Sequence, residues 1–157
     1  MSGLHSIRLA IDVATKKRDQ LSKELAEIQK TMLFSQGQLE QLQAYSGDTD
    51  ARWTSVARVC ATPELMRHHY QFMDRLHHAM GLQEGVLRDL LRRADVARKV
   101  LLDAEFRLNG LKRILATRQA EAMAGQVRRE QKQTDEFAAM QFRRVMGENQ
   151  LENPHEH

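Results

Sequence analysis

The stretch that decides the fold runs from Met73 to Ala122 and reads MDRLHHAMGLQEGVLRDLLRRADVARKVLLDAEFRLNGLKRILATRQAEA. Alternating strides of three and four residues from Met73 select fifteen positions, of which thirteen are apolar. The two exceptions are Gln83 and Arg118. An apolar residue every 3.5 positions keeps one stripe of a helix facing a partner helix. The stretch therefore predicts a long coiled-coil helix.

A second frame of the same kind precedes it. Eleven positions from Ile7 to Leu42 follow the same strides, and nine of them are apolar. The segment Ser46–Asp50 has the composition of a loop, yet the frame continues in phase beyond it to Cys60. We therefore expect one helix over residues 4–60, weakened near Gly47, with Cys60 as a small residue of the seam, the row of heptad positions shared by both frames.

The break between the two frames lies at Ala61-Thr62-Pro63-Glu64. Thr62 suits an N-cap, Pro63 suits the first helical position, and Glu64 complements the positive end of the helix dipole. The second helix is therefore predicted over residues 63–146.

Beyond the second helix, Gly147 and Pro154 are predicted to end the helical pattern. Residues 148–157 are then expected to form a flexible tail.

The short turn predicts that the second helix folds back against the first, with residue i opposite about residue 123 − i. About 30 residues of the second helix would then overhang the first. Two prolines in 157 residues, with 5% aromatic residues, exclude a sandwich, a barrel or alternating strands and helices. The predicted fold is all-α, a long two-helix antiparallel coiled-coil hairpin with a C-terminal helical overhang, as one domain over residues 1–147.

Several functional classes are excluded by what the sequence lacks. It has no phosphate-binding loop, no zinc-protease motif and no nucleophile elbow, so we expect no catalytic residues, no metal and no cofactor. The histidine pairs His68-His69 and His77-His78 have the wrong spacing for a shared metal ion. One cysteine excludes an internal disulfide, and the absence of a long apolar run predicts a soluble, cytoplasmic chain.

Charge is unevenly distributed along the second helix. The run from Arg107 to Lys132 carries seven basic and two acidic residues, a net charge of +5, while the whole chain carries +3. Two interpretations stay open: a solvated helix face, or a surface that docks to an acidic protein or nucleic acid. The near absence of aromatic residues argues against single-stranded nucleic acid. Three acid-before-base pairs are also predicted on exposed faces. They are Asp89/Arg93, Asp95/Lys99 and Asp103/Arg107.

A surplus apolar row lies beside the seam at the start of the second helix, formed by Phe72, Ala79 and Val86. A two-stranded coiled coil needs only a narrow apolar stripe, so one partner helix does not cover this row. Either Tyr45 and Trp53 of the first helix fold over it, or it forms a protein-docking patch.

Three ordered segments resemble a known family. They are Gln38-Leu39-x-x-Leu42-x-x-Tyr45, Tyr70-x-Phe72-Met73-x-x-Leu76-x-x-Ala79-Met80-x-x-Gln83, and Arg129-Glu130-Gln131-Lys132-x-x-Asp135-Glu136-Phe137-Ala138. With this chain length, the set resembles the FliJ family of flagellar type III export stalk proteins.

The resemblance implies a long antiparallel coiled coil similar to the central stalk of rotary ATPases. It implies binding to the hexameric flagellar export ATPase, to the cytoplasmic domain of the export gate membrane protein and to export chaperones. The chain would be peripheral at the inner face of the bacterial cell membrane, through these partners. The residues that match the gate-contacting patch of the family are Gln38, Leu42, Tyr45, Phe72, Leu76, Ala79 and Gln83. Thr49 stands where the family has an aromatic residue.

The overhang supplies a second expected docking surface, because its seam positions have no partner in the first helix and an unpaired amphipathic helix is marginal in water. We expect it to enter the pore of the ATPase ring together with the N-terminal part of the first helix. The predicted ring-binding residues are Ile7, Ile11, Arg18, Lys112, Arg113, Arg129, Gln131, Asp135 and Phe137.

Three other functions remain open at this stage. The chain could be the equivalent stalk of an injectisome, a generic scaffold that self-associates through the overhang, or a nucleic-acid-binding protein. The stalk interpretation expects a monomer and no nucleic acid. The scaffold interpretation expects a stable oligomer.

Overall fold

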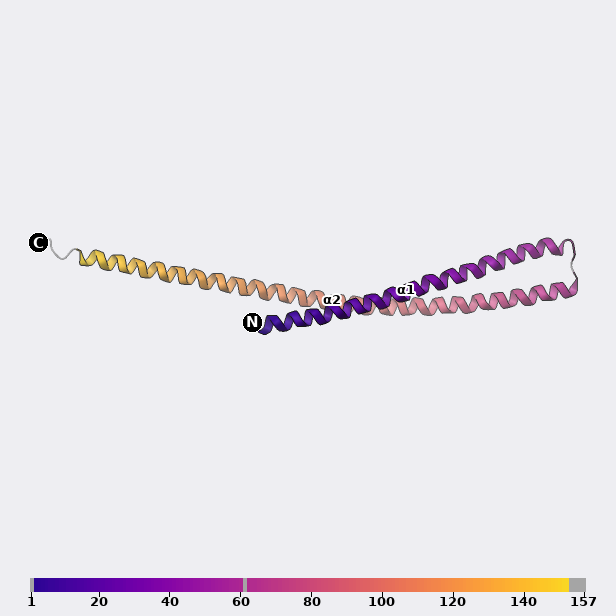
Figure 1. The fold of residues 1–157 in the computed structure, drawn as a ribbon, viewed down its shortest axis with the longest axis horizontal. Coiled ribbons are helices and arrows are strands. Elements are labelled where there is room, and N and C mark those ends of the chain that lie inside the picture. Colours follow the sequence, from indigo (N-terminus) through magenta and orange to yellow (C-terminus); the bar gives the residue numbers. More distant parts are fainter. Residues whose placement is uncertain (1, 61, 153–157) are drawn as a thin grey trace. The chain divides into compact units, whose positions relative to one another are not determined.

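The computed structural model describes residues 2–60 and 62–152. It contains two helices, α1 (Ser2–Ala57) and α2 (Pro63–Leu151), and no strand among the residues described (Figure 1). The predicted all-α hairpin class is confirmed.

The chain forms two compact units, which we name for use below. The hairpin unit comprises residues 13–108, and the terminal unit comprises residues 1–12 with 109–157. The expectation of a single domain over residues 1–147 stays a prediction.

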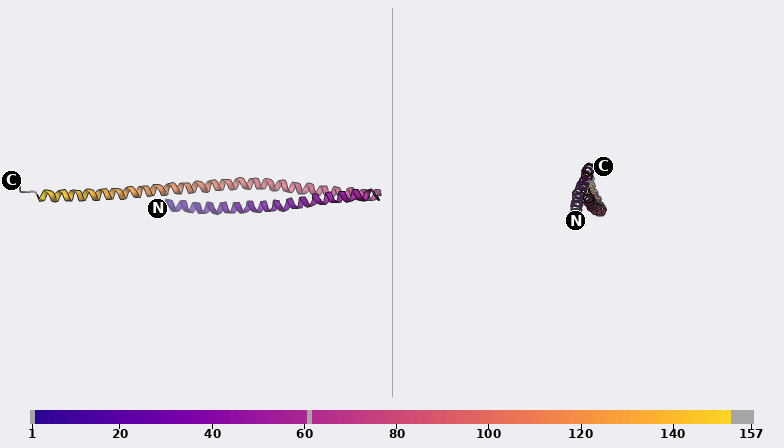
Figure 2. Two further views of the ribbon diagram at one scale, coloured as in Figure 1. Left: turned by 90° about the horizontal axis from the view of Figure 1, so that it is seen from above. Right: turned by 90° about the vertical axis from the view of Figure 1, so that its right-hand side faces the viewer.

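In the hairpin unit, α1 and α2 run antiparallel and side by side on either side of the turn (Figures 1 and 2). When a residue of α1 contacts a residue of α2, their two sequence positions sum to between 117 and 122. The predicted value of 123 is therefore too high by about three residues. The reason is that α1 ends at Ala57 rather than at residue 60, which centres the turn on residue 60.

The buried residues of the described chain all occupy predicted seam positions of the hairpin unit. They are Leu25, Ser35, Ser46, Met73, Leu76, Leu90, Ala94 and Leu108. Burying one leucine side chain contributes about 1.5–3 kcal/mol, so this narrow row is the core of the unit. The helix also continues through Ser46–Asp50, as the unbroken frame predicted.

The turn is closed by hydrogen bonds at the end of α1. The amides of Val59 and Cys60 donate to the carbonyl of Val56 at 3.0 and 2.9 Å. Cys60 follows the helix and is exposed, so its prediction as a seam residue is wrong.

The start of α2 is capped as the sequence predicted. The amide of Leu65 donates to Thr62 Oγ1 at 3.3 Å, and the amide of Met66 donates to the Thr62 carbonyl at 3.1 Å. Glu64 lies in the first turn, where a carboxylate complements the helix dipole. Thr62 therefore satisfies the amides of Leu65 and Met66 in the first turn of α2.

The other end of α2 lies at Leu151, five residues beyond the predicted residue 146. Gly147 is helical and does not end the helix, because one glycine costs a helix only about 1 kcal/mol. The first four residues of the predicted tail 148–157 are therefore helical, while residues 153–157, including Pro154, lie outside the described residues.

In the terminal unit, Ile7 and Ile11 of α1 and Leu111 and Leu115 of α2 are half-buried. The two helices come close at Gly3, where an added Cβ would lie 3.6 Å from Arg118 Nη1. From residue 126 to residue 152 every residue is exposed. We call residues 126–151 the exposed segment. It corresponds to the predicted overhang.

A search for membrane-crossing helices in the described part of the chain found no stretch of sufficient length and hydropathy.

Candidate partner-binding surfaces

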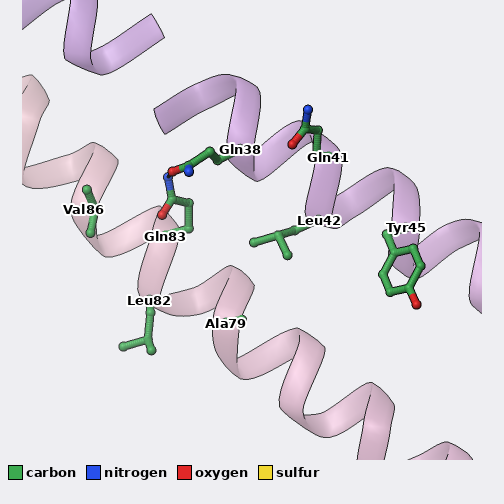
Figure 3. A pocket seen from close by; sticks show the side chains of 8 residues that line it. All are labelled: Gln38, Gln41, Leu42, Tyr45, Ala79, Leu82, Gln83 and Val86. Atoms are coloured by element: carbon green, nitrogen blue, oxygen red, sulfur yellow. Dashed lines mark hydrogen bonds between the residues drawn. The ribbon is translucent and has the colours of Figure 1, made fainter. Parts of the chain in front are cut away.

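An open groove of about 540 Å³ lies between α1 and α2 in the hairpin unit (Figure 3). Each helix contributes four residues to this first groove, and none of the eight is charged. They are Gln38, Gln41, Leu42 and Tyr45 from α1, and Ala79, Leu82, Gln83 and Val86 from α2.

Gln83 ties the two helices together at one end of the first groove. Its Nε2 atom donates to the Ser35 carbonyl at 2.8 Å and lies 3.3 Å from Gln38 Oε1 as a second acceptor. Figure 3 shows the Gln38 and Gln83 side chains directed toward one another. Gln83 is a polar residue in an apolar seam and favours one register, because any slip would place its amide against aliphatic side chains.

Tyr45 adjoins Phe72 at the other end of the first groove. Their rings pack edge to face, with centroids 6.0 Å apart and planes at 82°. Tyr45 nevertheless stays 54% exposed and Phe72 38% exposed. Tyr45 therefore contacts Phe72 of the surplus row, as one of the two interpretations expected. It does not cover the row, because Phe72 stays partly exposed.

Trp53, which one of the two open interpretations placed over the surplus row together with Tyr45, packs against another residue. Its ring stacks on His69, with centroids 4.4 Å apart and planes within 9° of parallel. His69 Nε2 also lies 3.8 Å from Asp50 Oδ1. These contacts join α1 to α2 next to the turn.

The structure brings together most of the residues that the resemblance assigned to the export gate. Five of the seven line the first groove, and Phe72 adjoins it through Tyr45. Leu76 differs, because it is only 8% exposed and belongs to the seam. Thr49, where the family has an aromatic residue, is half-buried.

Sequence reasoning missed Gln41 and Leu82 in the lining of the first groove. Leu82 had a detectable signal, because Ala79, Leu82 and Val86 are spaced three and four residues apart and so share one helix face. Gln41 is an ordinary polar residue of the sequence and had no such signal.

A second groove, of about 420 Å³, lies elsewhere between the two helices of the hairpin unit. It was not predicted from the sequence. It is lined by Leu21, Glu24, Ile28, Arg92, Arg93, Val96, Ala97 and Val100.

Two of the predicted ion pairs near this groove form with other partners. Asp89 pairs with Arg92 at 3.6 Å and Asp95 with Arg98 at 3.2 Å, each three residues apart instead of four. The predicted partners Arg93 and Lys99, and the pair Asp103/Arg107, make no ion pair among the described residues.

The predicted ring-binding residues do not all belong to one unit. Arg18 lies in the hairpin unit, half-buried, with its Nη2 atom 2.7 Å from Asp19 Oδ1. The other eight lie in the terminal unit. Of these, Ile7 and Ile11 are half-buried on α1. The exposed members are Lys112, Arg113, Arg129, Gln131, Asp135 and Phe137.

The basic run is fully presented to solvent. All seven basic side chains between Arg107 and Lys132 are exposed, and none makes an ion pair with a described residue. Arg129 instead donates from Nε to the Gly125 carbonyl at 3.3 Å. Their charge is therefore available to a partner.

The chemistry offered by these surfaces is that of binding. The first groove combines amide groups with aliphatic and aromatic surface, a composition typical of protein interfaces. Among residues 2–60 and 62–152, no three histidine, cysteine or acidic side chains gather where a metal ion would bind.

Comparisons with known proteins bear on the family of the chain. Searches of curated proteins and of solved structures returned no match. Residues 6–147 match the family described as "Flagellar FliJ protein", which covers most of the chain. The chain therefore belongs to the FliJ family and is a flagellar export-related protein.

Proposed function

We propose that this chain is a stalk that links the hexameric flagellar export ATPase to the cytoplasmic domain of the export gate membrane protein. It performs no chemistry itself and assists export chaperones and their substrates. The observation that carries the proposal is the exposed aromatic and aliphatic surface at the first groove, because the residues there are those that match the gate-contacting patch of the family.

The first groove suits a gate domain because its apolar area is exposed but rigidly held. The Gln83 hydrogen bonds hold the register of the two helices at one end, and the Tyr45–Phe72 contact holds the rings at the other. A preformed surface loses little side-chain entropy on binding.

The exposed segment suits a ring pore for a different reason. Its apolar side chains have no partner helix, so a surrounding protein wall would bury them. They include Phe137, Met140, Phe142, Val145 and Met146. The basic run would steer this end toward an acidic ring. The stalk would thus lie in the cytoplasm, peripheral at the inner face of the membrane, and would act as a monomer.

The gate contact is tested with Phe72→Ala, using the purified cytoplasmic domain of the gate protein in a calorimetric titration. We expect binding to weaken at least about tenfold while circular dichroism stays unchanged. Phe106→Ala is the matched control, because Phe106 is an exposed phenylalanine of the same unit that lies outside the groove. Equal affinity of the two variants would contradict the proposal, as would melting of the hairpin by Phe72→Ala.

The ring contact is tested by reversing charge, with Lys112→Glu and Arg113→Glu together. At low salt this double variant should bind the export ATPase at least about fivefold more weakly. Arg98→Glu with Lys99→Glu reverses an adjacent basic pair outside the run and should have little effect. Offering an injectisome ATPase in parallel separates the two kinds of stalk. Unchanged binding of the Lys112/Arg113 variant would count against the ring contact.

A self-associating scaffold is the second candidate, and the same exposed segment favours it. Static light scattering distinguishes the two. A monomer of large hydrodynamic radius fits the stalk, whereas a stable tetramer that Phe137→Glu dissociates fits the scaffold.

A further inference from the structure

The second groove differs from the first in the charge of its rim. The first groove has no charged lining residue, whereas the second is bordered by Glu24, Arg92 and Arg93. Its remaining lining residues are aliphatic. The two grooves of one unit therefore present different chemistry.

The apolar part of the second groove is accessible to a partner. Val96 is 62% exposed and Val100 is also exposed, although both lie beside the seam residue Ala97. On α1, the lining residues Leu21 and Ile28 are seven positions apart, which is two helical turns or about 10 Å. The apolar strip thus has the length of two turns of a partner helix.

The charged side chains of the rim make few contacts within the chain. Glu24 Oε1 lies 3.3 Å from Gln20 Nε2 and accepts its hydrogen bond. Arg93 makes no hydrogen bond or ion pair with a described residue. Arg92 is bridged only to Asp89, at 3.6 Å with both side chains largely exposed, and such pairs contribute little.

The part of α2 around the groove is also positively charged. Residues 88–100 of α2 carry five basic and two acidic residues, a net charge of +3. Both acids already pair with arginines of the same segment. Of the two lining arginines, Arg93 is unpaired among the described residues and Arg92 is held only by a long, exposed ion pair. A carboxylate on a partner could therefore bind either guanidinium beside an aliphatic strip, and guanidinium binds carboxylate with two parallel hydrogen bonds.

We infer that the second groove docks an acidic amphipathic helix of another protein, with two or three aliphatic side chains in the groove and carboxylates against Arg92 and Arg93. This goes beyond the proposed stalk function, because neither the gate-matching residues nor the ring-binding residues belong to the groove. A nucleic acid fits less well, since the groove floor is aliphatic and offers no aromatic ring for base stacking.

The test uses two labelled synthetic helical peptides and the full chain. One carries leucines at i, i+4 and i+7 flanked by glutamates, and the other has every glutamate replaced by lysine. Fluorescence anisotropy at about 50 mM salt should show the glutamate peptide binding at least tenfold more tightly, with the difference shrinking at high salt.

Variants locate the binding. Val96→Asp should weaken binding of the glutamate peptide at least tenfold, and Leu102→Asp should leave that binding unchanged. Leu102 is the matched control because it is 59% exposed on the same helix and lies outside the groove. Arg93→Glu should weaken binding of the glutamate peptide at least fivefold and strengthen binding of the lysine peptide.

Circular dichroism checks that the variants remain folded. Should Val96→Asp reduce helicity, Arg93→Glu decides the test, because it replaces an exposed side chain and leaves the seam intact.

Three outcomes would overturn the inference. The first is equal binding of the two peptides. The second is a loss of glutamate-peptide binding in the Leu102→Asp variant as large as in the Val96→Asp variant. The third is a dimer of this chain that Val96→Asp dissociates, because a second copy would then occupy the groove.

Discussion

The hairpin unit and the exposed segment use similar amphipathic helices with opposite results. Every buried residue of the described chain lies in the hairpin unit, between Leu25 and Leu108. In the exposed segment, side chains as large as Phe137 and Phe142 stay well over half exposed. Helix propensity is shared by both regions, so the difference lies in the partner helix. Packing against a partner helix stabilises the first region, and the second has no such packing among the described residues.

The largest effect should come from the core of the hairpin unit. Leu108 is 1% exposed, so Leu108→Ala leaves a cavity in a narrow seam and should lower the free energy of unfolding by about 2–5 kcal/mol. Urea denaturation followed by circular dichroism measures this loss. Phe137→Ala removes a larger but exposed side chain and should change stability by less than about 0.5 kcal/mol. Comparable losses in the two variants would remove the distinction between the regions.

Hydrogen exchange should separate the two regions directly. Amides of residues 126–151 lack tertiary packing and should exchange about 100-fold faster than those of residues 80–100. Exchange of the intact chain, read by mass spectrometry after proteolysis, gives both rates in one sample. Uniform protection along α2 would show that the exposed segment is stable without a partner.

The hydrogen bonds of Gln83 should have an intermediate effect on the free energy of unfolding. Gln83→Ala removes the hydrogen bonds to the Ser35 carbonyl and to Gln38, and should cost about 1–2 kcal/mol in urea denaturation. Gln41→Ala is the control, because Gln41 lines the same groove and its side chain makes no hydrogen bond with a described residue. If both glutamines prove equally dispensable, these hydrogen bonds contribute nothing to the hairpin.

The smallest effect should come from the cap of α2. Thr62→Ala removes the acceptor of the Leu65 amide and should cost about 1 kcal/mol, whereas Thr62→Ser keeps the hydroxyl and most of the stability. Thermal melting compares the two. A serine variant as unstable as the alanine variant would mean that the hydroxyl does not cap the helix.

The heptad pattern predicted the seam because sequence spacing decides which face of each helix meets the partner helix. All eight buried residues, including the polar Ser35 and Ser46, fall on predicted positions. The register was less predictable, because it depends on where α1 ends, and nothing in the composition near Ala57 marks that residue as the last of a helix. The same early end removed Cys60 from the seam.

The grooves were harder to predict than the seam. Residues such as Gln41 and Val96 line them only because of how the two helices pack locally, which spacing does not encode. The surplus apolar row left open whether Phe72 is covered by the first helix or accessible, and the structure shows it in contact with Tyr45 and partly exposed. Leu76 lies on the heptad frame and also matches the gate-contacting patch of the family, and its burial shows that it packs in the seam.

The stacking of Trp53 on His69 has a practical consequence. Trp53 is the one tryptophan of the chain, and its indole bridges α1 to α2 beside the turn. Its intrinsic fluorescence therefore reports whether the two helices stay in contact beside the turn. Any binding partner that lacks tryptophan and separates the helices would reveal itself by a change in that emission, without a dye or an engineered label.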